Sequence, residues 1–153
     1  LDKAKAFPLL KQQHPDAVAQ VEVRTFGDKP PVTNFGDLEI RTYESFRFDS
    51  EDTLVFRVGL TNKSDQEIRY GPGDLMVRAG NRLYHQSISD ASGVVPPLSE
   101  NTVWFAITGT PDGGRNELSL KNEFTVLFRR ERQLPKGEPP IQQVPQPEGK
   151  ERP

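Results

Sequence analysis

The chain has 153 residues, enough for one domain with a buried core, but its 33% hydrophobic content is low and its 14 prolines are many, so part of it is expected outside the core. The net charge of -2 comes from interspersed acids and bases, which excludes the broad positive field expected of a protein that binds nucleic acid or anionic lipid. The absence of cysteine excludes disulfides, thiol catalysis and a thiolate zinc site, and no apolar run approaches the roughly 20 residues that span a bilayer.

The first segment, residues 1–18, has a mixed pattern. Residues 2–6 favour a short helix, but Pro8 and Pro15 interrupt it, and isolated helices shorter than about 12 residues are marginal in water. We therefore expect a loose helical lead-in. The alternative is a docking helix with the apolar residues Phe7, Leu9 and Leu10. Because the chain opens on Leu1 and not on methionine, we expect a mature product or an excised fragment.

Strand patterns follow the lead-in. Val21 and Val23 alternate with polar residues and predict a first strand, which ends in a turn at residues 27–31. A second alternating run extends from Leu38 to Phe48 and is long enough to bend or to carry a β-bulge.

The clearest strand in the sequence begins at Thr53, where apolar residues occupy every second position up to Leu60. Turn-forming residues at 62–65 then break the pattern, and extended character resumes up to Tyr70. This stretch predicts one antiparallel hairpin. The turn also matches an N-glycosylation sequon at Asn62, which we interpret as a turn sequence.

Further strands are expected at residues 75–77, 82–84, 103–108, 118–120 and 124–128. Small, turn-forming residues predict loops at 87–99 and 109–116. About eight short strands with regular turns predict an all-β fold, an antiparallel β-sandwich of immunoglobulin-like type over residues 19–132. A β-barrel is the alternative architecture. The residues expected to face the core are Leu38, Ile40, Leu54, Phe56, Val58, Leu60, Phe105, Ile107, Phe124 and Val126.

The last segment, residues 133–153, is rich in proline and has few large apolar side chains. It cannot bury enough surface to offset the entropy of ordering, so we expect a disordered, extended tail or linker. Binding of this tail to a proline-recognising groove is the alternative.

Candidates for catalysis and metal binding are weak. Of the two histidines, His85 precedes several serines, but no G-x-S-x-G motif is present to place a nucleophile. Acidic residues gather at 49–52, and residues 90–93 begin like a metal-dependent adhesion motif, yet neither has a complete ligand pattern. We therefore predict no catalytic residue, metal or cofactor; a carboxylate pair that converges only in space is the alternative.

Four aromatic residues lie off the strongest apolar stripes and are candidates for binding: Trp104, Tyr43, Tyr70 and Tyr84. On an exposed sheet face they could anchor a protein partner or stack on sugar rings. The alternative is that Trp104 packs beneath the lead-in or a loop.

Residues 37–128 resemble the DUF4352 or telokin-like group of bacterial immunoglobulin-like domains. The resemblance rests on VFRVGLTNKSDQEI, then GDLMVRAGNRLY, then VPPLSENTVWFAI. It implies an exported or surface-anchored accessory module, periplasmic or extracellular, with no shared catalytic residues.

These observations favour a noncatalytic interaction or structural module of a bacterial envelope or secreted protein. Its expected partner is a protein in the cell envelope, bound through a sheet face or edge strands. A carbohydrate-binding module that uses the exposed aromatic residues for polysaccharide is the alternative, and a hydrolase with a carboxylate pair is a third.

Overall fold

A computed structural model describes residues 1–110 and 114–129. The helical elements are α1 (Asp2–Lys5), α2 (Phe7–Gln13) and the short 3-10 turns η1 (Pro15–Val18), η2 (Asp49–Glu51) and η3 (Pro72–Asp74). The strands are β1 (Val21–Thr25), β2 (Val32–Phe35), β3 (Leu38–Phe48), β4 (Thr53–Asn62), β5 (Ile68–Arg69), β6 (Leu75–Ala79), β7 (Arg82–His85), β8 (Ile88–Ser89), β9 (Val94–Val95), β10 (Glu100–Thr108) and β11 (Phe124–Phe128).

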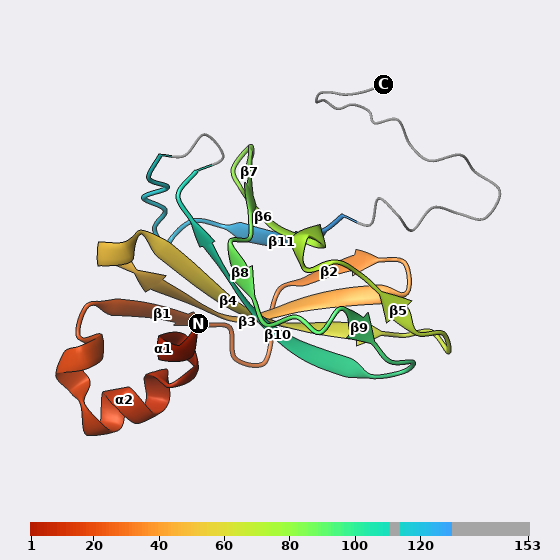
Figure 1. Ribbon diagram of the computed structural model, residues 1–153, viewed down its shortest axis with the longest axis horizontal. Helices are drawn as coiled ribbons and strands as arrows, with labels where there is room; N and C mark the ends of the chain where they lie inside the picture. Colours follow the sequence, from red (N-terminus) through yellow and green to blue (C-terminus); the bar gives the residue numbers. More distant parts are fainter. Residues whose placement is uncertain (111–113, 130–153) are drawn as a thin grey trace.

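The larger sheet has six strands: five in the order β1-β3-β4-β10-β8, and β2, which pairs with the first half of β3 along the same edge as β1 (Figure 1). All these pairs are antiparallel. The register of β3 against β4 shifts between Thr42 and Glu44, which confirms that the long strand carries a bulge. The bulge places Tyr43 and Glu44 on the same face of the sheet.

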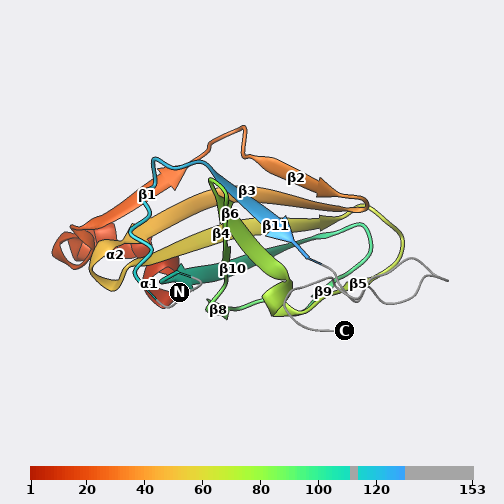
Figure 2. The same cartoon turned by 90° about the horizontal axis from the view of Figure 1, so that it is seen from above.

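A smaller sheet, β11-β6-β7, packs against the larger one, and Figure 2 shows its strands lying across β3 and β4. Phe56 of β4 joins the layers: its ring stacks on Phe105 at 5.4 Å and meets Phe124 of β11 edge-on, also at 5.4 Å. The predicted antiparallel β-sandwich is confirmed. Of the residues predicted to face the core, all are buried except Phe124, which is partly buried against it.

The predicted hairpin over residues 53–70 is wrong. Both edges of β4 are already occupied, by β3 and β10, and β5 pairs with β9 instead. Asn62, which is only 1% exposed, fixes the path of the chain between β4 and β5. Its side-chain N–H groups donate to the carbonyls of Gln66, Val95 and Pro96 at 2.7, 3.1 and 3.2 Å. The turn is therefore fastened to the β9 segment, and the amide of the sequon is buried within it.

Four smaller differences concern short segments. Residues 118–120, predicted as a strand, are irregular, and β2, β8 and β9 form where no strand was predicted. These strands have two to four residues, so their extended shape depends on the partner strand and not on a local pattern.

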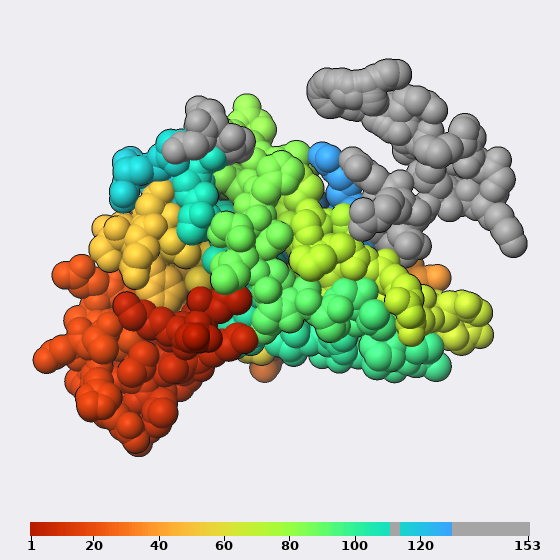
Figure 3. All heavy atoms as spheres, in the orientation of Figure 1, coloured from red at the N-terminus to blue at the C-terminus, as the bar shows by residue number. Residues whose placement is uncertain are grey.

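The helical lead-in packs on the face of the larger sheet that points away from the smaller one, and forms one end of the molecule in Figure 3. Ala4 is 1% exposed and joins a second apolar cluster with Phe46, Phe48, Val55 and Ala106 of the sheet. The helical character of the lead-in is confirmed, and this cluster gives its short helices tertiary contacts that an isolated helix lacks. Its looseness stays a prediction.

Among the described residues, no helix is both long and apolar enough to cross a membrane. The predicted tail at residues 133–153 and the domain boundary at residue 132 lie outside the described residues.

Candidate functional site

A groove of about 930 Å³ runs between the lead-in and the outer face of the larger sheet; we call it the aromatic groove. Its wall is formed by helical residues Ala4, Lys5, Phe7, Pro8, Lys11 and Gln12. Its floor is formed by sheet residues Val23, Thr25, Glu44, Phe46, Arg57 and Trp104. The groove is thus built from segments that are far apart in the sequence.

The strand register explains why these floor residues meet. Trp104 lies opposite Arg57, Arg57 opposite Glu44, and Glu44 opposite Thr25, so the residues form a row across β10, β4, β3 and β1. Opposite residues in paired strands point to the same face. Phe46 belongs to the next row, which the lead-in covers.

Aromatic rings and one guanidinium group make up the centre of the floor. Phe7 meets Phe46 edge-on at 5.7 Å, and Phe46 stacks on Trp104 at 5.9 Å. The Arg57 guanidinium lies 4.9 Å from the ring of Tyr43 and 5.9 Å from that of Trp104, both within cation–π range. Arg57 also donates to Glu44 at 2.9 Å, so contacts with Tyr43, Trp104 and Glu44 together orient its guanidinium group.

Tyr43 stands beside the groove and is held over Gly59. Its hydroxyl donates to Glu100 at 2.5 Å. A Cβ atom at position 59 would lie 2.1 Å from the Glu100 carboxylate and 2.8 Å from the Tyr43 ring, so only glycine leaves room for this crossing. Burial, the hydrogen bond to Glu100 and the charge of that carboxylate raise the pKa of Tyr43.

The four predicted binding aromatics divide into two pairs. Trp104 and Tyr43 are half-buried and lie on one face, joined by Arg57. Tyr70 and Tyr84 are 7% and 4% exposed and belong to the main core, so they do not form part of the surface that was predicted for them. Burial raises the pKa of Tyr70, whose ring packs edge-on against Phe128 at 5.6 Å.

The alternative role for Trp104, packing beneath the lead-in, is confirmed in part. Its ring contacts the apolar cluster that includes Ala4 and Phe46, yet it also lines the aromatic groove. Sequence reasoning missed Phe46, Arg57 and Glu44 as site residues, since only the register places them beside Trp104. Phe7 belongs to the docking-helix alternative, in which its apolar character indicates a binding residue.

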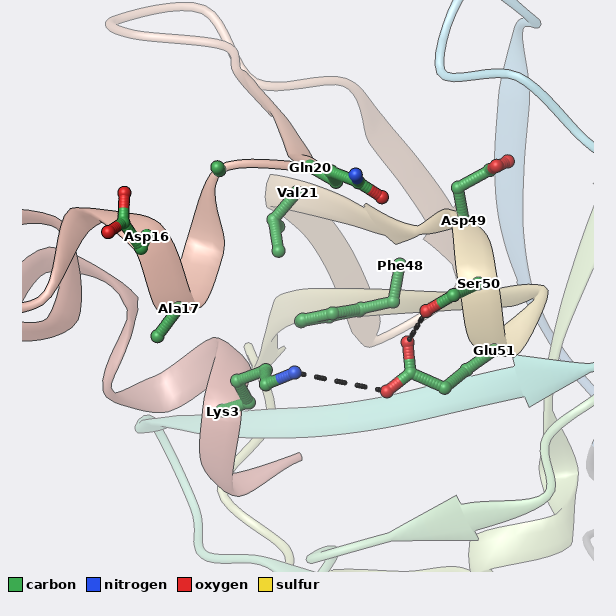
Figure 4. A pocket seen from close by; sticks show the side chains of 10 residues that line it. Lys3, Asp16, Ala17, Gln20, Val21, Phe48, Asp49, Ser50 and Glu51 are labelled. Atoms are coloured by element: carbon green, nitrogen blue, oxygen red, sulfur yellow. Dashed lines mark hydrogen bonds and ion pairs between the residues drawn. The ribbon is translucent and has the colours of Figure 1, made fainter.

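A second, smaller pocket of about 240 Å³ lies between the lead-in and the turn after β3 (Figure 4). Lys3 approaches Glu51 at 3.9 Å, and Ser50 donates to the same carboxylate at 3.0 Å. The carboxylates of Asp16 and Asp49 point away from this pair in Figure 4. Within the described ranges, no group of three or more histidine and acidic side chains could hold a metal ion.

Asp52, predicted as a member of an acidic cluster, is instead buried with Arg47. The Arg47 guanidinium donates to Asp52 at 2.9 Å and to Asn116 at 2.9 Å. The N–H groups of Asn116 and Glu117 donate to the Asp52 carboxylate at 2.6 and 2.8 Å. These contacts tie the chain before β11 to the turn between β3 and β4.

The candidate adhesion motif has a structural role as well. The Asp90 side chain accepts a hydrogen bond from the N–H of Trp104 at 2.9 Å and pairs with Lys5 at 2.7 Å. It therefore occupies part of the free edge of β10 and fastens α1 to it. His14 and His85 are both exposed.

No family model and no curated protein matches this chain. Among solved structures, the chain is similar to a functionally unknown protein from Listeria monocytogenes EGD-e, with 8% sequence identity and a TM-score of 0.38. The alignment covers 71% of this chain and 87% of that one. The resemblance to DUF4352 domains therefore stays a prediction.

Proposed function

We propose that this protein is a noncatalytic binding module of the bacterial envelope or of a secreted protein, and that it binds a protein partner in the aromatic groove. The observation that carries the proposal is the half-buried Trp104 ring, which stacks on the buried Phe46 and is bordered by exposed polar residues of α2. A buried aromatic anchor within a polar rim is the usual anatomy of a protein interface.

The sheet face supports this binding mode better than the edge of β10. Part of that edge is paired with β8, and the Asp90 carboxylate takes the N–H of Trp104. Fewer backbone groups are therefore left there for an added strand.

Carbohydrate remains the alternative ligand, because Trp104 and Tyr43 share one face of the sheet. Sugar rings stack on open aromatic faces, whereas the Trp104 ring is stacked on Phe46 and has Arg57 near it. The burial of Tyr70 and Tyr84 removes two further platforms.

Site-directed photo-crosslinking tests the proposal. A photoreactive residue is placed at Gln12 in the groove wall, or at Lys121 as an exposed control position, and the full chain is incubated with envelope extract of the source organism. We expect one protein to be captured from Gln12 and not from Lys121. Once purified, that protein should change the emission of Trp104, the single tryptophan, in a saturable manner.

Two variants make the result specific. Trp104→Ala should abolish the capture, while Leu83→Ala, which alters an exposed apolar residue on the smaller sheet, should leave it unchanged. Saturable binding of a glycan panel, without protein capture, would overturn the protein-binding proposal in favour of the carbohydrate alternative. Capture that does not depend on Trp104 would also overturn it.

A further inference from the structure

The floor of the aromatic groove consists of strand faces and not of strand edges. Glu44, Arg57 and Trp104 lie in strands whose backbones are paired with one another in the sheet. A ligand on this floor therefore meets side chains, but no row of free backbone N–H and C=O groups. An extended peptide would find no backbone partners on this floor, whereas a helix pairs its own backbone groups internally.

The wall of the groove presents one face of α2. The lining residues Phe7 and Lys11 are four positions apart, and so are Pro8 and Gln12. Residues at this spacing form parallel ridges on a helix, and side chains of a second helix pack between such ridges. The wall is therefore suited to a helix that lies alongside α2.

The row of residues across the floor is long enough for a short helix. The row from Thr25 to Trp104 crosses β1, β3, β4 and β10. Three intervals between adjacent strands span about 14 Å, which corresponds to about ten helical residues.

The charges of the groove favour an acidic partner. Two of its basic side chains already have acidic partners: Lys5 pairs with Asp90 at 2.7 Å, and Arg57 with Glu44 at 2.9 Å. Lys11 forms no ion pair with any described residue, and α2 contains no acid. The Lys11 ammonium lies 5.9 Å from the centre of the Phe7 ring, at the groove, and an acidic side chain of a partner could form an ion pair with it there.

From these observations we infer that the segment bound in the aromatic groove is an acidic amphipathic α-helix. It packs beside α2, places its apolar stripe on the partly exposed rings of Phe7 and Trp104, and directs an acidic residue to Lys11. This inference rests on the protein-binding function proposed above and adds the chemical class of the partner.

Selection from two displayed peptide libraries tests it. Both contain peptides of about 16 residues, longer than the expected contact, with leucines at helical spacing and other positions random; one library also carries a central proline that breaks the helix. The full chain is the bait. We expect enrichment from the helical library only, of peptides with acids beside the leucine stripe, and each should shift the Trp104 emission.

A charge exchange between peptide and protein identifies the contact. Lys11→Glu should weaken the enriched peptide about tenfold, and replacing the facing acid by lysine in the peptide should restore binding to that variant. Lys121→Glu, which reverses an exposed charge elsewhere, should leave affinity unchanged. Because Lys11 is exposed, its replacement leaves the fold intact, and an unchanged melting temperature verifies this.

Other outcomes separate the two proposals. If the groove-dependent peptides come from the proline library, or are basic, the helix inference is overturned and the protein-binding function stands. If no peptide from either library depends on Trp104 or Lys11, the inference is overturned and the proposed function loses its support as well.

Discussion

At the scale of single residues, Arg47 shows how this fold accommodates a charge almost completely removed from water. Arg47 and Asp52 are each 4% exposed, and they pair at 2.9 Å. Burial by itself raises the pKa of Asp52, but hydrogen bonds from Arg47 and from the N–H groups of Glu117 and Asn116 outweigh that effect, so the pKa lies below its ordinary value of 3.8. The pair is stable in the interior because every charged group has a partner.

The pair makes stability depend on pH. Because the folded pKa of Asp52 is lowered, its contribution is complete above 3.8 and is lost as the pH falls through the folded value. Asp52→Asn should lower the free energy of unfolding by about 3–5 kcal/mol at neutral pH, because it leaves the Arg47 charge uncompensated. Urea denaturation from about pH 7 to about pH 2 should show this difference shrinking in acid.

Asp49→Asn is the matched control. Asp49 accepts from the same arginine at 3.3 Å, but its side chain is 78% exposed, so its replacement should change stability little at any pH. A wild-type advantage over Asp52→Asn that stayed constant through the acid range would contradict the assignment.

At the scale of elements, the lead-in is a short helical segment whose order depends on its contacts with the sheet. α2 has seven residues, too few for a stable helix in isolation. Phe7 packs edge-on against Phe46, and Lys5 pairs with Asp90 at 2.7 Å. The element thus depends on these contacts for its order, and it forms the wall of the aromatic groove.

Replacing Phe7 should release this element without unfolding the sandwich. In Phe7→Ala, amide hydrogens of residues 4–13 should exchange on the order of tenfold faster than in the wild type, while those of β3 and β4 should be unchanged. Hydrogen exchange followed by mass spectrometry measures both. Leu9→Ala serves as the control, because Leu9 is 53% exposed on the same helix. Equal acceleration in the two variants would show that Phe7 is not the anchor.

At the scale of the whole molecule, the two sheets form one cooperative unit through a shared aromatic core. Phe56 contacts Phe105 within its own sheet and Phe124 across the interface. Leu54, Val58 and Leu60, fully buried on the same face of β4, extend this layer. Loss of its central ring therefore weakens both sheets together.

Phe56→Ala should lower the free energy of unfolding by about 3–5 kcal/mol, since it removes a ring from a close-packed site. Fluorescence and circular dichroism should report a single transition at a lower temperature. Leu98→Ala, at a position 72% exposed, should stay within about 0.5 kcal/mol of the wild type. Two separate transitions in Phe56→Ala would contradict one cooperative unit.

The alternation of apolar and polar residues predicted those features that depend only on neighbours along the chain. The alternation in β3, β4 and β10 predicted their buried faces, because a strand places successive side chains on opposite faces. The same pattern could not assign Tyr70 or Tyr84. Neither tyrosine lies on a strong apolar stripe, and only packing against Phe128 and β6 determines that they are buried.

The sequence by itself determined the all-β class and most of the core, since these follow from periodicity, and the length of β3 predicted a bend or a bulge in that strand. Only the tertiary structure decided that β5 pairs with β9 and not with β4. Whether β4 has a free edge depends on which other strands pair with it, and β3 and β10 occupy both edges. The aromatic groove, too, was decided only by the tertiary structure. Phe7, Phe46, Arg57 and Trp104 come from four separate elements. The antiparallel register that aligns Phe46, Arg57 and Trp104 is a property of the sheet, and Phe7 joins them through the packing of α2 on Phe46.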